Sequence, residues 1–163
     1  MQKNVKTLAR AGIIAALYTV LTLIVFPISS GAIQVRISEA LTLLPLLFIE
    51  AIPALAVGCM LSNLITGCAA FDIVFGALIT LIAAILTYFS GKIIKSTPLK
   101  ILVGGLFPVL LNAAFLPLIW VYCYGALEYV YYIQALLLVV GQSVSVYLFG
   151  TPVVLKLNKI LTK

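Results

Sequence analysis

The sequence predicts an all-α membrane protein, a bundle of six transmembrane helices with cytoplasmic N- and C-termini. The 163-residue chain is 64% hydrophobic and 9% charged, which leaves too little polar surface for a water-soluble globule. Nine of its ten Lys and Arg residues also form three clusters, and such residues concentrate in cytoplasmic loops. The clusters contain Lys3, Lys6 and Arg10; Lys92, Lys95 and Lys100; and Lys156, Lys159 and Lys163.

The apolar runs between these clusters set the number of crossings. Residues 11–26 cross once from the first cluster, so residues 27–37 are expected outside. The 54 residues of 38–91 return to the second cluster, which requires an odd number of crossings, and three fit because a span needs about 20 residues. The 55 residues of 101–155 begin and end inside and suit two crossings.

The whole chain, residues 1–163, is predicted to form one transmembrane domain. Breaks near Pro53 and near residues 70–72 separate the three central helices. The second helix is short and contains Pro45, so we expect it to be broken, tilted or partly interfacial. The predicted helices cover residues 7–26, 38–52, 53–70, 72–91, 101–122 and 127–156.

Several kinds of segment and chemistry are not expected. The N-terminus imitates a signal peptide, with small residues at 29–32, but we expect it to be retained because its removal would leave five helices. Three cysteines without CxxC spacing and the absence of histidine predict neither a metal site nor a cofactor. No P-loop or G-x-S-x-G sequence occurs, and we expect no enzymatic activity.

The four carboxylates carry most of the functional information. Glu39, Asp72 and Glu128 each lie at the outer start of a predicted helix, and Glu50 alone belongs to the inner side. Acids at helix N-termini are favoured by the helix dipole, so a capping role without function is the alternative for each of them. Three acids with a single arginine, Arg36, would make the outer mouth negative and attract a cation or a donor-rich ring.

Amides within the apolar helices predict a pocket below that mouth. Asn63 and Asn112 lie about 15 and 17 Å along their helices, and Gln134 lies about 9 Å along the last one. Buried amides also join helices to one another, which stays the alternative and is our expectation for the deeper Gln142. Trp120 is the residue that we expect to stack on a flat ligand, while the aromatic residues around it are expected to form a belt at the lipid headgroups.

Small residues on the first helix predict where another helix could approach closely. Ala11 and Ala15 form one such ridge, and Gly12 and Ala16 form the adjacent one. A six-helix bundle with a ligand pocket on one side and no ATP-binding motif needs an outside source of energy, and this helix is our candidate for the contact that supplies it.

Four short motifs carry a family resemblance. They are residues 33–41 (IQVRISEAL), 51–58 (AIPALAVG), 62–64 (SNL) and 72–76 (DIVFG). With six predicted helices, basic termini and an alanine-rich first helix, the chain resembles the QueT family, the substrate-binding (S) components of energy-coupling factor transporters. The resemblance spans the whole chain and is strongest over residues 33–85. Residues 66–68 (TGC) depart from it, because more glycine is expected there.

The resemblance implies a function and a set of partners. The ligand would be a queuosine precursor, 7-aminomethyl-7-deazaguanine or queuine, taken up through the plasma membrane. The partners would be a transmembrane coupling subunit, docked at Ala11 and Ala15, and two ATPases, with the lipid bilayer around them and no nucleic acid. An S component for another small molecule, such as a vitamin, and a membrane scaffold protein without transport are the alternatives.

The chemistry of this ligand suits the acids. A deazaguanine presents an N–H and an NH₂ side by side, which one carboxylate accepts two-pronged, and the aminomethyl group adds a positive charge. Glu39 or Asp72 would bind the guanine-like edge, Glu128 would face the cationic arm, and Arg36 would hold the outer loop as a lid through Glu39 at i+3. The amides would bond the ring oxygen and nitrogens: Asn63, Asn112 and Gln134.

Overall fold

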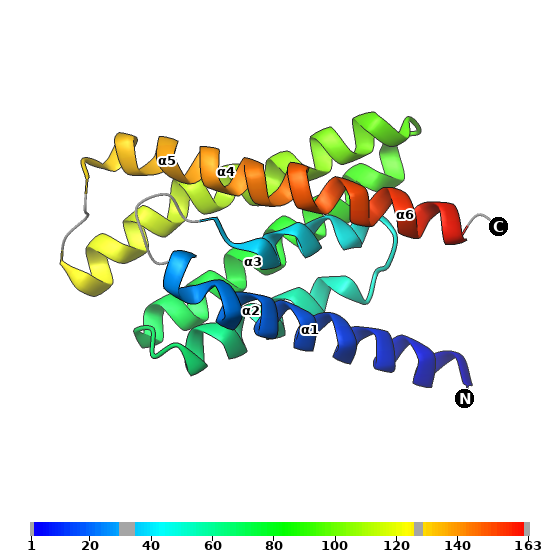
Figure 1. The fold of residues 1–163 in the computed structure, drawn as a ribbon, viewed down its shortest axis with the longest axis horizontal. Coiled ribbons are helices and arrows are strands. Elements are labelled where there is room, and N and C mark those ends of the chain that lie inside the picture. Colours follow the sequence, from blue (N-terminus) through cyan, green and yellow to red (C-terminus); the bar gives the residue numbers. More distant parts are fainter. Residues whose placement is uncertain (1, 30–34, 126–128, 162–163) are drawn as a thin grey trace.

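The computed structural model describes residues 2–29, 35–125 and 129–161, and the regular elements there are all helical. The elements are α1 (Gln2–Ser29), the 3₁₀-helix η1 (Ile37–Leu46), α2 (Ala51–Ile65), α3 (Ala70–Ile93), α4 (Thr97–Tyr124), α5 (Tyr131–Ser143), the π-helix η2 (Val144–Gly150) and α6 (Thr151–Leu161). The last three elements, α5, η2 and α6, follow one another as a single continuous helix, so the elements form six helical segments (Figure 1). The prediction of an all-α chain with six helical segments is confirmed for these residues.

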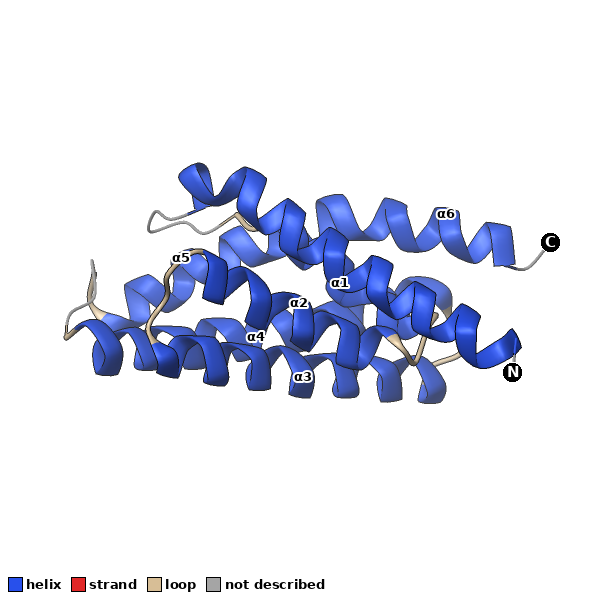
Figure 2. Cartoon of the chain, turned by 90° about the horizontal axis from the view of Figure 1, so that it is seen from below, coloured by secondary structure: helices blue, strands red, loops and turns tan. Residues whose placement is uncertain are grey.

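Successive segments run in alternate directions along the bundle (Figures 1 and 2). The start of α1, the end of α6 and the turns at 47–50 and 94–96 lie at one end, which we call the basic end. The helices α1, α2 and α4 finish, and η1, α3 and α5 begin, at the opposite end, which we call the site end. The basic end takes its name from the described lysines and arginine there: Lys6, Arg10, Lys92, Lys95, Lys100, Lys156 and Lys159.

Four helices are long and apolar enough to cross a membrane, whereas η1 and α2 are apolar but shorter. The four candidate spans are Asn4–Phe26, Ala70–Ile93, Thr97–Tyr124 and Tyr131–Leu161. The chain is therefore suited to a membrane. The six crossings and the cytoplasmic position of the termini stay predictions.

The second segment differs from the predicted helix 38–52. It is a 3₁₀-helix that ends at Leu46, and α2 begins at Ala51 rather than at 53. The 3₁₀ form rises about 2.0 Å per residue, so ten residues span about 20 Å instead of about 15 Å as an α-helix. The start of α2 lies before Pro53 because a proline in the first turn has no backbone N–H bond to lose.

The three-residue turn of η1 sorts its side chains into three rows, which are buried from Ser38 to Pro45. One row packs on α1 and α2, where Leu41 and Leu44 join an apolar cluster, and another packs on α4, η2 and α6 through Leu43. The third row carries Glu39. The rows contain Ser38, Leu41 and Leu44; Ala40, Leu43 and Leu46; and Glu39, Thr42 and Pro45.

Close packing fixes α1 against α2. A Cβ atom at Gly58 of α2 would lie 2.9 Å from the Ala15 carbonyl oxygen and 2.9 Å from the Tyr18 Cβ atom. On the outer face of α1, a Cβ atom at Gly12 would have nothing within 4 Å. The close approach of a neighbouring helix therefore requires a glycine at position 58 but not at position 12.

We expect Gly58→Ala to lower the free energy of unfolding by about 1–3 kcal/mol, because the added methyl group must push α1 away. The matched control is Gly12→Ala, which should raise it by about 0.5–1 kcal/mol because alanine favours an exposed helix. Denaturant unfolding of both variants in the same detergent measures the difference. Equal stabilities would contradict the close approach of α1 and α2.

Candidate functional site

The Glu39 carboxylate lies inside the bundle and is bonded from two other helices. The side chain is 2% exposed on η1. The Tyr18 hydroxyl of α1 donates to Glu39 Oε1 at 2.6 Å, and the Asn112 Nδ2 of α4 donates to Glu39 Oε2 at 3.5 Å. One carboxylate therefore connects η1, α1 and α4. The structure brings Glu39 and Asn112, which the sequence named separately as binding residues, within hydrogen-bond distance of each other.

Asn63 forms a second junction at the site end. Its Oδ1 accepts from Arg36 Nη2 at 3.2 Å, and its Nδ2 donates to the Asp72 carbonyl oxygen at 3.3 Å. Gly76 leaves room for this amide, since a Cβ atom there would lie 3.0 Å from Asn63 Nδ2. The predicted residues Asn63, Asp72 and Arg36 thus lie together, joining α2, α3 and the segment before η1.

The Asp72 carboxylate points to α4. Its Oδ2 accepts from the Tyr124 hydroxyl at 3.4 Å, and the same hydroxyl accepts from the Ala69 backbone N–H at 3.1 Å. Asp72 is 7% exposed, so it is almost as enclosed as Glu39. Tyr124 thus links α3 and α4 through its hydroxyl, while the residue as a whole is 54% exposed; its predicted place in the headgroup belt stays a prediction.

Arg36 is bonded to an amide rather than to an acid. The predicted lid contact with Glu39 is present only through the backbone, where the Glu39 N–H donates to the Arg36 carbonyl oxygen at 2.9 Å. Burial acts to lower the pKa of the Arg36 guanidinium, but attraction to the ionised forms of Tyr18 and Cys59, and then of Glu39 and Asp72, outweighs it and raises that pKa. Because an arginine stays protonated in proteins, the site holds a permanent cation near the Glu39 and Asp72 carboxyl groups.

The inner-side acid is separate from this cluster. Glu50 Oε1 lies 2.9 Å from Arg10 Nε at the basic end, and it is the one ion pair within 4.0 Å among the described residues. The Arg10 guanidinium also lies 5.0 Å from the centre of the Phe48 ring. Glu50 is thus part of a structural contact between α1 and the turn before α2.

The other predicted residues have different surroundings. Gln134 on α5 is 2% exposed, and Trp120 packs at the edge of an apolar cluster that contains Ile79 and Leu116. Ala15 is buried against α2 in the apolar cluster that contains Leu41 and Leu44, and Ala11 packs beside that cluster. Glu128 lies outside the described residues.

Tyr18 is the site residue that sequence reasoning missed. It is 1% exposed, and its ring packs against Gly58 while its hydroxyl reaches Glu39. The available signal was its place on the buried face of α1, four residues after Ile14, because a tyrosine enclosed in an apolar bundle needs a partner for its hydroxyl.

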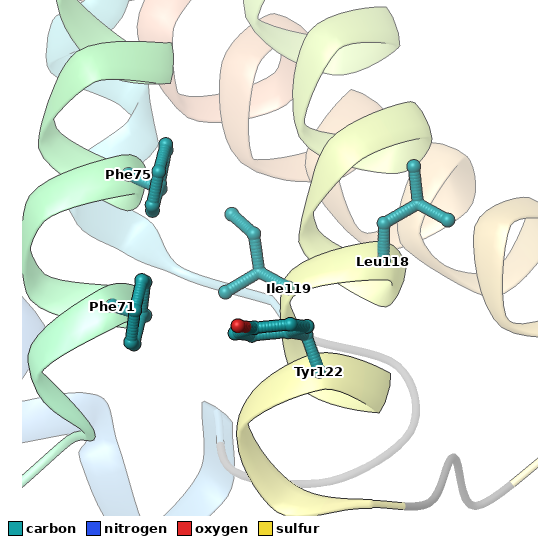
Figure 3. A pocket seen from close by; sticks show the side chains of 5 residues that line it. All are labelled: Phe71, Phe75, Leu118, Ile119 and Tyr122. Atoms are coloured by element: carbon teal, nitrogen blue, oxygen red, sulfur yellow. The ribbon is translucent and has the colours of Figure 1, made fainter.

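An apolar groove of about 370 Å³ lies between α3 and α4 at the site end (Figure 3). The rings of Phe71 and Phe75 are stacked with centres 5.9 Å apart, and Tyr122 meets Phe71 edge-on at 5.3 Å. Its three aromatic side chains are 45–75% exposed, so the groove opens to the surroundings of the bundle. This is the surface expected of an aromatic belt. The lining residues are Phe71, Phe75, Leu118, Ile119 and Tyr122.

The cluster is rich in hydrogen-bonding groups but offers little for a metal ion. In the described part of the chain, no three His, Cys, Asp or Glu side chains gather closely enough to bind one. The cluster offers carboxylates, amides and one guanidinium, which are groups that recognise hydrogen-bond donors and acceptors.

Comparison with known proteins places this architecture. The model of the QueT transporter family matches residues 8–159. The chain belongs to the QueT transporter family. No curated protein and no solved structure matches it. As a QueT-family chain with several apolar helices, it is a membrane transport protein rather than an enzyme, and the family resemblance seen in the sequence motifs is confirmed.

We expect Tyr18→Phe to lower the free energy of unfolding of this QueT-family chain by about 1.5–3 kcal/mol, because a buried carboxylate loses a hydrogen bond. Tyr147→Phe is the control, since its hydroxyl donates at 2.7 Å to the neutral Leu102 carbonyl oxygen. That variant should lose about 0.5–1.5 kcal/mol. Thermal unfolding at neutral pH compares the two, and a smaller loss for Tyr18→Phe than for Tyr147→Phe would argue against the Glu39 contact.

Proposed function

We propose that this chain is the substrate-binding component of an energy-coupling factor transporter, and that it binds 7-aminomethyl-7-deazaguanine or queuine for uptake through the plasma membrane. The observation that carries the proposal is the buried Glu39 carboxylate, held at both oxygens by Tyr18 and Asn112. Ionisable groups within membrane helices are costly and mark functional sites, so a purely structural reason for this acid is disfavoured.

The bonding capacity of Glu39 matches the edge of a deazaguanine. A carboxylate has about four lone-pair positions, and Tyr18 and Asn112 use one on each oxygen. One position on each oxygen remains, which is what the N1–H and 2-amino donors of the ring require when they bind side by side. We therefore assign the guanine-like edge to Glu39.

The second half of the site suits the rest of the ligand. Asp72, in the first turn of α3, supplies negative charge for the aminomethyl group, with Glu128 as its predicted companion. Asn63 and Gln134 are assigned to the ring oxygen and nitrogens together with Asn112, and Trp120 to stacking. Arg36 closes the site end through Asn63, so its release from that amide would open a path to Asp72.

The packing of α1 leaves only one of its two ridges of small residues free to contact a coupling subunit. Ala15 lies against Gly58 inside the chain, and Ala11 is half-buried. Gly12 and Ala16, one residue further along, are exposed. We propose that this outer ridge of small residues receives the coupling subunit, which carries the two ATPases.

We expect Glu39→Gln and Asp72→Asn to weaken binding of 7-aminomethyl-7-deazaguanine by about ten- to hundredfold each, since a charge-assisted hydrogen bond is worth about 1.5–3 kcal/mol. Glu50→Gln is the control and should leave the affinity unchanged, because its carboxylate pairs with Arg10 at the basic end. Isothermal titration of the purified protein measures all three.

Thermal-shift measurements with queuine, 7-aminomethyl-7-deazaguanine, guanine and a set of vitamins test the function itself. Stabilisation by the deazaguanines supports the proposal. Stabilisation by a vitamin alone would make the chain an S component for that vitamin, and no stabilisation by any compound would favour a scaffold without transport.

We expect Ala16→Trp to abolish ligand uptake while the affinity for the ligand stays near that of the unchanged protein, because a large side chain on the outer ridge keeps a partner helix away. Ala15→Trp is the contrasting variant: it should unfold the α1–α2 contact and lose binding and uptake together. Co-purification of the coupling subunit and uptake into cells are the readouts. Normal co-purification with Ala16→Trp would exclude this ridge.

A further inference from the structure

Gln142 of α5 carries an unsatisfied amide in the middle of the bundle. The side chain is 0% exposed, and neither its Nε2 nor its Oε1 has a hydrogen-bond partner among the described residues. The sequence had favoured a role in joining helices, and this geometry contradicts it. A buried amide without partners opposes folding and is rare in native structures, so it requires another explanation.

The neighbours of Gln142 along its own helix locate the amide. Leu138, one turn earlier, packs in an apolar cluster with Ala113 of α4. Val146, one turn later, packs in a different cluster with Val109 of α4. Gln142 therefore occupies the layer between these two apolar clusters.

The same layer contains the proposed binding groups. On α4, the buried residue between Val109 and Ala113 is Asn112, which donates to Glu39. The helices α4 and α5 run side by side in opposite directions (Figure 1). The level between the two clusters therefore corresponds to residues 110–112 of α4, which include Asn112. Gln142 thus lies at about the same level along the bundle as Asn112, and its amide has no hydrogen-bond partner among the described residues.

The backbone beyond Gln142 supports a functional reason for this arrangement. The π-helix η2 begins two residues later, and such wide turns are rare and frequently occur at functional sites. At its end, a Cβ atom on Gly150 would lie 2.7 Å from the Ala40 carbonyl oxygen, so η2 lies directly against η1, the helix of Glu39. The helix of Gln142 is therefore fixed against the helix that carries the binding carboxylate.

We propose that Gln142 is a specificity-determining residue of this site, and that its amide binds an edge of the ligand ring that presents an acceptor beside a donor. The inference rests on the proposed function. A carboxamide offers one donor and one acceptor side by side, the combination with which Gln and Asn bind adenine two-pronged. On a free 7-deazaguanine, N3 beside N9–H has this pattern once Glu39 takes N1–H and the 2-amino group.

The test uses Gln142→Met, which keeps the length of the side chain and removes both polar atoms. Without ligand, the melting temperature of the purified full chain should equal or exceed that of the unchanged protein, because an unpaired amide is gone. The affinity for 7-aminomethyl-7-deazaguanine and queuine should fall about tenfold or more. Ser145→Ala is the control: this buried hydroxyl already donates to the Gly141 carbonyl oxygen at 3.0 Å, so the affinity should not change.

Each other result overturns part of the reasoning in a distinguishable way. Unchanged affinity with Gln142→Met would overturn the role of Gln142 and leave the proposed function intact. If this variant fails to fold, the Gln142 amide forms hydrogen bonds that the fold requires, and its role in ligand specificity is overturned as well. If the unchanged protein binds a different ring compound and Gln142→Met weakens it tenfold, the proposed ligand is wrong and the role of Gln142 stands. Binding of no ring compound would overturn both.

Discussion

The hydrogen bond between Tyr18 and Glu39 is the contact on which the arrangement of the bundle depends. Apolar side chains give little preference for one helix neighbour over another in lipid, because lipid tails are equally apolar. Polar contacts and close backbone approach must then decide which helices pack together. The 2.6 Å bond holds α1 to η1, Asn112 holds α4 to the same carboxylate, and Gly58 lets α1 approach α2.

The 3₁₀ form of η1 makes this convergence possible. A repeat of three residues directs each row of the helix to a different side, so one short segment can contact α1 and α2 with one row and α4, η2 and α6 with another. An α-helix of ten residues would be about 5 Å shorter, and residues three apart would be displaced from one another by about 60° around its axis. Long 3₁₀-helices are uncommon, and the complete burial of residues 38–45 explains why this one persists.

The sequence predicts the coarse organisation because that organisation follows from strong and local signals. Apolar runs, prolines and basic clusters set the six helical segments, and the positions of the acids at segment starts placed Glu39 and Asp72 at one end. The extent of η1 could not be predicted, because its hydrogen-bond pattern is fixed by tertiary contacts rather than by its own residues. The periodicity of α1 likewise cannot tell which of its two ridges of small residues is covered by another helix. The ridge of Ala15 is covered because Gly58, 43 residues later in the chain, lets α2 approach it closely.

The site showed the same limit. Asn63 and Asn112 were recognised from their polarity, but their partners were not, because a side chain's neighbour across helices depends on rotation that a single sequence does not specify. Arg36 illustrates this: the i+3 spacing suggested Glu39, and the guanidinium instead reaches Asn63 on α2. Gln142 had been interpreted as joining helices, since nothing in the sequence marks an amide as unpaired.

The proposed function gives α1 a role that follows from its two faces. Tyr18 points inward to Glu39. Ala16, two residues earlier and about 200° around the helix, faces outward as part of the proposed docking ridge. A ligand whose donors share the Glu39 charge weakens the charge-assisted bond from Tyr18, because that bond's strength depends on the negative charge of its acceptor. Ligand and coupling subunit then act on opposite faces of one rigid helix. By linkage, if the ligand changes the affinity for the coupling subunit by some factor, the coupling subunit changes the affinity for the ligand by the same factor.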